Sequence, residues 1–358
     1  MALALQQIVE QVRSARGPLV IRGGNSKAFY GESVIGEPLD TNALRGINSY
    51  EPSELVVTVQ AGTPLAELEA ALAEQGQCLP FEPPRFSGRE TVGGMVAAGL
   101  AGPARANVGG VRDYMLGATM INGRGEALAF GGQVMKNVAG YDVSRLLVGS
   151  LGVLGVICEV SLKVLPIAPA RTTLEFHHEE AEALEHLNTW AGQPLPINAS
   201  AWRDGRLYLR LSGARAAVDA AVRRLGGDVV DAAAADALWL GQRDHGGTFH
   251  HRAMEAVEGG LAWWRLSVPS TAAPLGLGGD WMIEHGGSQR WLVTDLPAAD
   301  VRAAATQAGG HATLFRALDK SSGVFAPLSA TLDRLHRSLK QAFDPRGLFN
   351  PGRMYPGF

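Results

Sequence analysis

The chain has 358 residues, of which 46% are hydrophobic and 19% charged, and its formal net charge is −3 at pH 7. This composition excludes an intrinsically disordered chain, and the small net charge excludes the basic surface of a typical nucleic-acid-binding protein. No stretch reaches the roughly 18 apolar residues that span a bilayer. The length predicts two domains.

The first region is rich in glycine. Residues 1–16 predict a short amphipathic helix and not a signal peptide, because Glu10 lies within them and no basic region precedes them. An apolar strand, Leu19–Ile21, then leads directly into Gly23-Gly24-Asn25-Ser26-Lys27, and further glycine pairs and triplets follow at 91–94, 107–110 and 149–155. Successive backbone N–H groups in such turns form anion-binding sites. Several such loops predict a large, phosphate-bearing cofactor held by backbone.

Regular elements are predicted between these loops. Residues 55–59 predict a buried strand, and Thr63 then predicts a helix N-cap with Pro64 at the first helical position. The apolar stripe of that helix is Leu65, Leu68 and Leu72, and Gly76 ends it. Residues 155–164 predict a second strand, and the prolines of 166–170 predict a domain boundary.

The second region predicts a repeated ββαβ order. Asp204-Gly205 indicates a hairpin turn between alternating strands, and a helix at 214–225 and a strand at 229–230 follow. The order recurs as strands at 281–284 and 289–294, a helix at 297–308 and a strand at 312–315. Two such units predict an antiparallel sheet with helices on one face. The alanine-rich residues 231–237 predict helix or loop.

The last region predicts one helix and a docked tail. The helix ends at Asp344-Pro345. Its apolar residues recur at helical spacing: Leu328, Leu332, Leu335, Leu339 and Phe343. The tail at 348–353 combines apolar anchors with rigid turn residues, so we expect it to pack against the rest of the chain.

Two other kinds of cofactor-binding protein do not fit the sequence. The glycine spacings at 23–25 and 149–155 do not match the G-x-G-x-x-G pattern of a Rossmann fold. Cys78 and Cys158 are too few for an iron–sulfur cluster, and we expect both to be buried thiols in a reducing compartment.

The ordered segments resemble the FAD-binding domain of the vanillyl-alcohol oxidase, or PCMH-type, superfamily. The matching segments are 21–30, 51–63, Leu79-Pro80, 91–102, 112–117, 136–142, 149–157 and the tail 343–352. Within that superfamily the chain most resembles the E-subunit family of bacterial glycolate oxidases, through residues 149–155, 264–269 and 286–291.

This resemblance implies an α+β fold in three parts. Residues 1–168 would form a two-lobed PCMH-type FAD-binding domain. Residues 169–317 would form an antiparallel-sheet cap domain with ferredoxin-like ββαβ units, serving substrate or an interface. Residues 318–358 would return to the FAD domain.

The resemblance also implies a cofactor site. Gly23 through Lys27 would hold the FAD pyrophosphate by backbone N–H groups, and Asn350 would reach toward the flavin. The resemblance assigns the remaining contacts to Pro80, Thr91, Gly93, Gly94, Arg112, Asp113, Gly155, Val156 and Ile157. Asn25 and Ser26 stand where many relatives carry a histidine that binds FAD covalently, so noncovalent FAD is expected.

The catalytic role of the chain stays open at this stage. The H-x-G-D-G-N-x-H pattern of related 2-hydroxy-acid dehydrogenases is missing, and residues 244–251 are expected to be a loop with solvated histidines, so no metal site is predicted. Arg265 and Arg290, with Arg316, suit a carboxylate clamp but equally an ion pair or interface. His285, like His311, suits a base near neutral pH, although a structural role is more common.

Two hypotheses therefore remain for function. In one, the chain itself oxidises a small 2-hydroxy acid such as glycolate or D-lactate. In the other, it is an FAD-binding, electron-transfer or structural subunit of a glycolate oxidase, working with a catalytic flavoprotein paralogue and an iron–sulfur subunit. The second hypothesis implies a cytoplasmic protein with any membrane contact made through partners.

Overall fold

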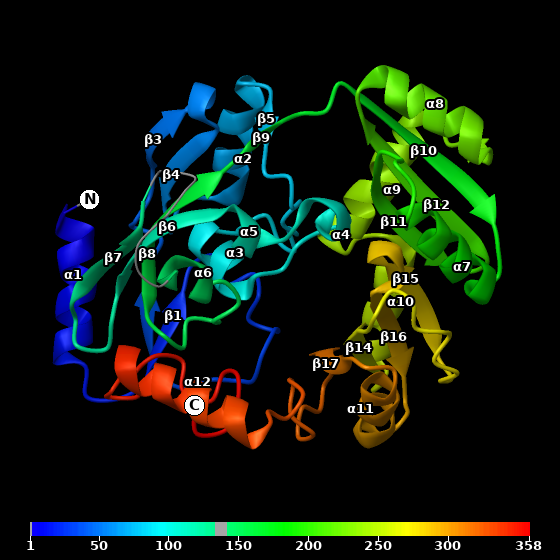
Figure 1. Ribbon diagram of the computed structural model, residues 1–358. Helices are drawn as coiled ribbons and strands as arrows, with labels where there is room; N and C mark the ends of the chain where they lie inside the picture. Colours follow the sequence, from blue (N-terminus) through cyan, green and yellow to red (C-terminus); the bar gives the residue numbers. More distant parts are fainter. Residues whose placement is uncertain (1, 133–141) are drawn as a thin grey trace. The chain divides into compact units, whose positions relative to one another are not determined.

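The computed structural model describes residues 2–132 and 142–358, which form two compact units (Figure 1). The first unit comprises Met1–Leu100, Gly110–Ile167 and Pro327–Phe358. The second comprises Ala101–Gly109 and Ala168–Ala326. The segment 136–141, which contributed to the family resemblance, lies outside the described residues. None of the helices that are described is long and apolar enough to cross a bilayer.

The first unit is built on an antiparallel sheet of order β3-β4-β8-β6-β7. Its strands are β3 (Ile47–Glu51), β4 (Val56–Gln60), β6 (Met115–Ile121), β7 (Ala127–Gly131) and β8 (Val156–Lys163). Every residue of β4 is buried, as expected for the apolar run at 55–59. A separate parallel pair joins β1 (Leu19–Arg22) to β2 (Glu37–Asp40), and β5 (Gln77–Cys78) pairs with β9 (Leu165–Pro166).

Short helices complete this unit. The amphipathic α1 (Ala2–Ser14) is present as predicted and buries Ile8 and Val12 against Leu19 and Ile121. The others are α2 (Leu65–Glu74), α3 (Val92–Ala98), α5 (Val111–Tyr114) and α6 (Val143–Leu146), with the 3-10 turn η1 (Pro52–Glu54).

The start of α2 differs from the prediction by one residue. Pro64 is the N-cap, and the Thr63 hydroxyl does not cap the helix. Instead, Thr63 Oγ1 accepts from the backbone N–H of Gly46 at 2.9 Å. The Thr63 hydroxyl, which the sequence predicted as the helix cap, therefore bonds to a loop that lies 17 residues earlier in the chain. The predicted stripe Leu65, Leu68 and Leu72 is correct, since all three side chains are fully buried.

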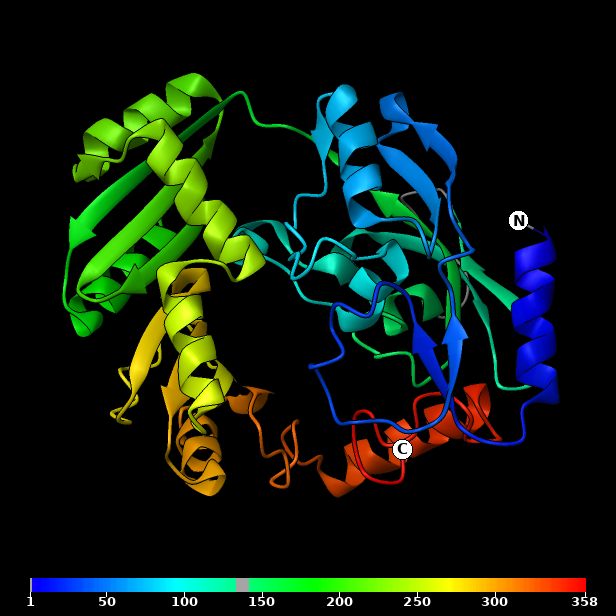
Figure 2. The ribbon, with the colours of Figure 1, turned by 180° about the vertical axis from the view of Figure 1, so that it is seen from behind.

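The C-terminal helix α12 (Ala330–Phe343) ends at the predicted residue, but its apolar stripe is not its buried face. Leu332 and Leu335 are 46% and 55% exposed, whereas Lys340 is buried. The tail does dock, as predicted: Leu348 and Phe349 are buried, and the Leu19 N–H donates to the Leu348 carbonyl at 2.7 Å. Figure 2 shows this segment, in red, beside β1.

The second unit holds one eight-stranded antiparallel sheet of order β13-β10-β12-β11-β15-β16-β14-β17. Its strands are β10 (Ala170–His177), β11 (Ile197–Arg203), β12 (Arg206–Gly213), β13 (Asp228–Val229), β14 (Ala262–Ser267), β15 (Asp280–Glu284), β16 (Gln289–Thr294) and β17 (His311–Arg316). The predicted Asp204-Gly205 turn joins β11 to β12, with both residues at positive φ. Both predicted ββαβ units are present, and they share this one sheet.

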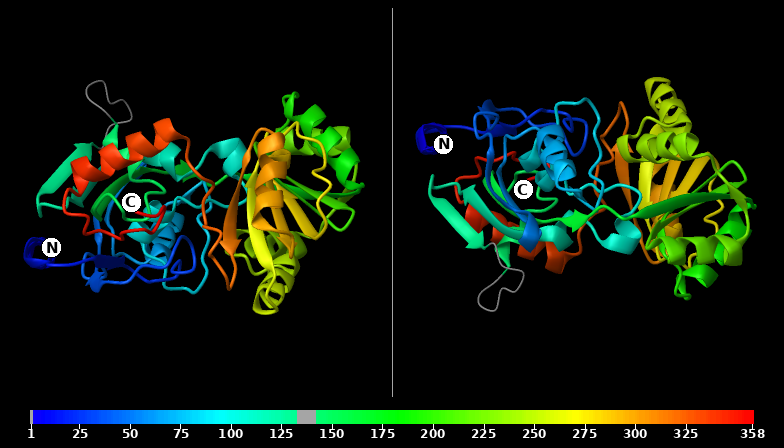
Figure 3. Two further views of the ribbon diagram at one scale, coloured as in Figure 1. Left: turned by 90° about the horizontal axis from the view of Figure 1, so that it is seen from below. Right: turned by 90° about the horizontal axis from the view of Figure 1, so that it is seen from above.

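Helices cover both faces of that sheet, which corrects the expectation of one (Figure 3). The helices α7 (Glu180–Ala191), α8 (Arg215–Leu225) and α11 (Ala298–Gln307) pack on one face, through Leu174, Leu209 and Leu266 among others. The helices α9 (Ala232–Asp244) and α10 (Thr248–Glu258) pack on the other. The sequence prediction left 231–237 as helix or loop and expected a loop at 244–251, and so missed this second layer. A short helix, α4 (Arg105–Val108), and the 3-10 turn η2 (His285–Gly287) complete the unit.

Two of the three histidines of residues 244–251, His245 and His250, are not solvated, contrary to expectation, whereas His251 is exposed on α10. His250 lies in α10 and is fully buried, with its ring centroid 4.7 Å from that of His245. Burial lowers the pKa of His250 to about 3 and the pKa of His245 well below its ordinary value. Both rings are therefore neutral parts of an aromatic core that includes Trp263.

Candidate cofactor site

A pocket in the first unit opens where β1 ends. The strand delivers Arg22 to the rim, and the glycine-rich loop 23–28 forms one wall. One side of α3 with its N-cap Thr91, the residue Leu151 and two residues of the C-terminal tail complete it. The lining residues are Val20, Ile21, Arg22, Gly23, Gly24, Asn25, Ser26, Lys27, Ala28, Thr91, Gly94, Ala97, Ala98, Leu151, Asn350 and Arg353. Eight of the predicted cofactor residues, Gly23 through Lys27, Thr91, Gly94 and Asn350, thus come together.

The loop presents unused hydrogen-bond donors to this pocket. Within the part of the chain that is described, the backbone N–H groups of residues 23–27 donate to no protein acceptor. Asn25 is exposed and the other four residues are half-buried, so these N–H groups are available to a ligand in the pocket. Asn25, at φ 55°, is the residue that turns the loop through the left-handed region. Such successive N–H groups bind phosphate-type anions.

The two glycines of the loop are needed for space. A Cβ on Gly24 would lie 1.4 Å from the carbonyl oxygen of Arg89, and one on Gly23 would lie 2.3 Å from Thr91 Oγ1. Thr91 is itself fixed, because Oγ1 accepts from the Gly94 N–H and caps α3. The close approach that requires glycine is therefore between the loop and residues 89–91.

The C-terminal tail holds both ends of the loop. At its start, Asn350 Oδ1 accepts from the Ile21 N–H at 3.0 Å, while Nδ2 donates to the Leu151 carbonyl at 2.7 Å. At its end, Arg353 Nη2 donates to the carbonyls of Lys27, Ala28 and Tyr30 at 2.7–3.2 Å. Asn350 thus lies at the pocket as expected, but its amide positions β1 and residue 151.

A buried ion pair network anchors that tail. Lys340 Nζ donates to Asp344 Oδ2 at 2.8 Å and to the carbonyls of Val153 and Phe349 at 2.7 and 2.8 Å. Asp344 Oδ2 also accepts from the Phe349 N–H at 2.8 Å. Burial lowers the pKa of Lys340, and Asp344 counteracts part of that effect. Because all three ammonium protons are used, the lysine connects α12, the tail and the segment at 153.

Lys27, which lines the pocket together with Arg22 and Arg353, lies near the buried acid Glu90. Burial lowers the pKa of Lys27 to about 8, although the charge of Glu90 opposes the shift. Burial alone would raise the pKa of Glu90, but hydrogen bonds from backbone N–H groups, with the charge of Lys27, bring it below its ordinary value. Glu90 Oε1 accepts from the N–H groups of Phe86 and Ser87 at 2.7 and 2.8 Å. A protonated Lys27 next to the open N–H groups favours an anionic ligand.

The other predicted cofactor residues lie elsewhere in the unit. Gly93 packs behind the pocket, where its N–H donates to the Ala61 carbonyl. Val156 and Ile157 are buried in β8, and a Cβ on Gly155 would lie 2.2 Å from Met120 Cε. The remaining three do not line the pocket: Pro80 is half-buried, Arg112 is exposed, and Asp113 is exposed with Oδ2 accepting from the Gly110 N–H.

The arginine and histidine candidates of the second unit are used in different ways. Arg290 in β16 is fully buried, and its guanidinium donates to the carbonyls of Gly287, Ala273 and Ala272. These contacts support a structural role. Arg265 in β14 is half-buried, and Arg316 in β17 has its pKa lowered to about 10 by burial.

His285 is a buried turn residue. It has φ 53° at the start of η2, and its Nε2 lies 3.1 Å from the Gly102 carbonyl. Because a carbonyl only accepts, Nε2 carries the proton. Burial lowers the pKa of His285 to about 4, and the Gly102 hydrogen bond opposes the shift. The ring is neutral at pH 7, so its pKa lies below the range of a base tuned to neutral pH.

Sequence reasoning missed several residues that build the pocket. These residues are Arg353, Lys340 and Glu90, and each of them hydrogen-bonds to backbone groups. No sequence motif predicts such bonds, because the partners are distant in the chain or do not recur at a regular spacing. In α12 the sequence predicted that the leucines would be buried, whereas the structure buries Lys340. Cys78 and Cys158 form no disulfide; Cys158 is buried as expected, which raises its pKa to about 12, whereas Cys78 is only half-buried.

Comparisons with known proteins agree with this geometry. Residues 2–131 match the family described as FAD binding domain. The chain is 48% identical over 352 residues, 98% of its length and 97% of the relative's, to "Glycolate oxidase subunit GlcE" of Escherichia coli (strain K12). It is 30% identical over 170 residues, 47% of its length and 36% of the relative's, to "Glycolate oxidase subunit GlcD" of Bacillus subtilis (strain 168).

The fold matches as well. A solved alkyldihydroxyacetonephosphate synthase superposes with a TM-score of 0.66 at 15% identity, covering 97% of this chain and 74% of that one. Fold and pocket thus define an FAD-binding flavoprotein of the PCMH type. The chain belongs to the GlcE family of that superfamily.

Proposed function

We propose that this chain is the FAD-binding E-type subunit of a glycolate oxidase, a complex that oxidises glycolate, and D-lactate as a similar 2-hydroxy acid, to the 2-oxo acid. The observation that carries the proposal is the end-to-end 48% identity to GlcE. A catalytic flavoprotein paralogue and an iron–sulfur subunit are the proposed partners, because the two cysteines cannot hold a cluster. We infer a cytoplasmic location, with any membrane contact made by partners.

The pocket residues fit FAD by their own chemistry. The open N–H groups of residues 23–27 would bind the pyrophosphate, with Lys27 adding a positive charge. Thr91 and Gly94 would line the neighbouring wall, while Asn350 and Arg353 keep the loop in its binding shape. Bound FAD would supply two-electron redox chemistry.

The second unit favours a subunit role over independent catalysis. The H-x-G-D-G-N-x-H pattern of related dehydrogenases does not occur in the sequence. Of the candidate groups, Arg290 is occupied by three carbonyls and His285 is buried with a lowered pKa. Arg265 stays a candidate for a carboxylate clamp or an interface contact.

One experiment separates these roles. The chain is purified alone and with its two proposed partners, and each preparation receives glycolate without oxygen while the flavin spectrum is recorded. We expect reduction of the flavin in the assembled complex and none in the isolated chain. Bleaching of the isolated chain would show that it is independently catalytic, and full glycolate oxidation by the partners without it would overturn the subunit proposal.

The mode of FAD attachment is tested in the same preparations. No histidine stands in the loop 23–27, and Cys78 and Cys158 do not line the pocket. We therefore expect acid precipitation to release all of the flavin into the supernatant. Flavin that stays with the precipitated protein would show a covalent link.

A further inference from the structure

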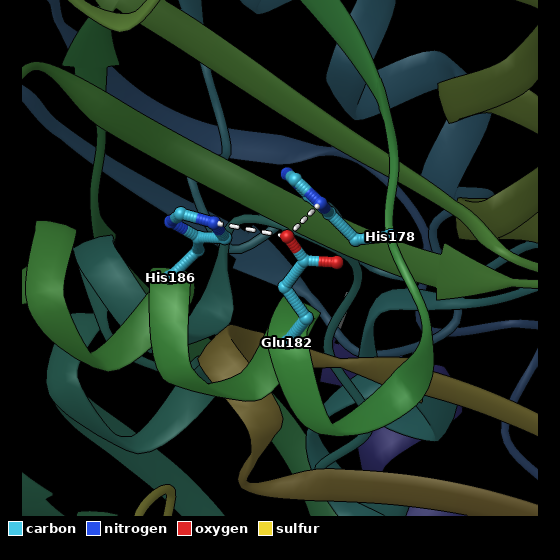
Figure 4. Close-up of side chains that lie close together, drawn as sticks. All are labelled: His178, Glu182 and His186. Atoms are coloured by element: carbon cyan, nitrogen blue, oxygen red, sulfur yellow. Dashed lines mark ion pairs between the residues drawn. The ribbon is translucent and has the colours of Figure 1, made fainter.

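A cluster of three metal-ligating side chains lies in the second unit, on residues that the sequence analysis did not single out. His178 follows β10, and Glu182 and His186 lie one and two turns along on α7 (Figure 4). Their nearest ligand atoms all lie within 4.8 Å of one another. The spacing of four residues brings Glu182 and His186 to one face of α7, and His178 precedes the helix by two residues. It is the pattern that could have indicated the cluster from sequence.

Both imidazoles point at the same carboxylate oxygen. His178 Nδ1 lies 3.0 Å from Glu182 Oε1, and His186 Nε2 lies 3.7 Å from the same atom (Figure 4). Ligands in a tetrahedral zinc site lie about 3.4 Å apart, given bonds of about 2.0–2.2 Å. The two nitrogen–oxygen distances, 3.0 and 3.7 Å, lie on either side of that value. The Glu182 side chain is 53% exposed, so it can change its conformation to bring both distances closer to that value.

One nitrogen of the cluster is buried without a satisfactory partner. His178 Nδ1 is shielded from solvent, and its contact with Glu182 lacks the geometry of a hydrogen bond. A buried polar atom in that state is costly unless a ligand completes it. The nitrogen is thus available to a ligand shared with Glu182 and His186.

The two imidazoles are held in place by their surroundings. The His178 N–H donates to the Gly205 carbonyl at 3.0 Å, and its own carbonyl accepts from Trp202 Nε1 at 2.8 Å. The rings of His178 and His186 stack with centroids 4.5 Å apart, and His186 stacks on Trp190 at 5.1 Å. The hairpin β11–β12 and the aromatic stack thus limit the movement of the two nitrogen ligands.

We propose that His178, Glu182 and His186 form a binding site for a divalent transition-metal ion, with Zn²⁺ as the best fit. Two imidazoles and one carboxylate are ligands that zinc accepts, and three protein ligands leave a position for water or an anionic group. The site belongs to the second unit, so it is separate from the FAD pocket of the first. It does not depend on the proposed function.

The test uses the full FAD-loaded chain after dialysis against a chelator. Zn²⁺ alone is titrated by calorimetry, and Co²⁺ alone is added to record its visible absorption as a difference from the flavin spectrum. We expect one ion per chain, a cobalt band of imidazole–carboxylate coordination and a higher thermal midpoint with metal. Failure to bind one ion per chain would overturn the proposal.

Variants identify the ligands. Glu182→Gln and His186→Gln keep side-chain size and should each weaken Zn²⁺ affinity at least about tenfold, since even outer partners of metal ligands contribute about 10–100-fold. His177→Gln is the matched control, because His177 is an exposed neighbour outside the cluster. FAD content and the metal-free thermal midpoint report folding of each variant. Equal Zn²⁺ affinity in the wild type and both folded ligand variants would overturn the site.

Discussion

The glycine loop of the first unit and the turn at 285–290 of the second differ in how their polar groups are used. Among the residues that the structure describes, the loop has five backbone N–H groups without a protein acceptor, whereas Asn350 and Arg353 hydrogen-bond to the backbone on either side of it. In the segment 285–290, Arg290 at the start of β16 gives all of its hydrogen bonds to three carbonyls. Both segments looked functional in sequence. The comparison shows that hydrogen-bond donors without a protein acceptor indicate a ligand site better than the residue type does.

The largest expected effect comes from closing the loop. In Gly24→Val the new Cβ would meet the Arg89 carbonyl, so the N–H groups cannot keep their arrangement. We expect loss of FAD, measured as flavin absorbance per chain. Gly17→Val is the control, because a Cβ there has no atom within 4 Å. A Gly24→Val protein with stoichiometric FAD would place the pyrophosphate site elsewhere.

The next effect comes from the support of the loop. Lys340→Met leaves Asp344 charged and buried, and losing one partner of a buried pair costs about 3–5 kcal/mol. We expect a lower thermal midpoint and weaker FAD binding, measured by scanning calorimetry and fluorescence titration. Arg337→Met on the same helix removes an exposed pair with Asp333 and should change little. Equal effects of the two variants would contradict the role given to Lys340.

A smaller effect is expected in the turn. Arg290→Met leaves three carbonyls without their donor, which should cost about 2–4 kcal/mol of stability while FAD stays bound. The thermal midpoint measures the effect, and the exposed Arg171→Met in the same sheet is the control. If Arg290→Lys kept its midpoint but raised the KM for glycolate in the assembled complex, the residue would belong to substrate binding.

The smallest effect is a pH dependence. Lys27, with a pKa of about 8 before FAD binds, is protonated below that pH and favours the pyrophosphate in that form. Proton loss as the pH rises therefore weakens binding, by at most about tenfold per pH unit above 8. Titrations of the apoprotein between about pH 7 and 9 should show this slope, and Lys27→Met should remove it. The same slope in both proteins would exclude Lys27 as its source.

Much of the fold was predictable because the signals are local. Alternation around Asp204-Gly205 predicted the hairpin β11–β12, and apolar spacing predicted α2 and α12 within one or two residues. The second helical layer was missed, because α9 and α10 bury a face containing Trp239 and His250 that does not read as a plain apolar stripe.

The sequence by itself determined the glycine loop, the strand before it and the family to which the chain belongs. Only the tertiary structure decided which polar groups stay open to a ligand. Ile21 and Asn350 are 329 residues apart, yet their hydrogen bond shapes the loop. The physical reason is that hydrogen-bond satisfaction depends on partners distant in the chain, while glycine content and apolar period are local properties. The same reason explains why the sequence suggested a carboxylate clamp for Arg290 and no role for Lys340.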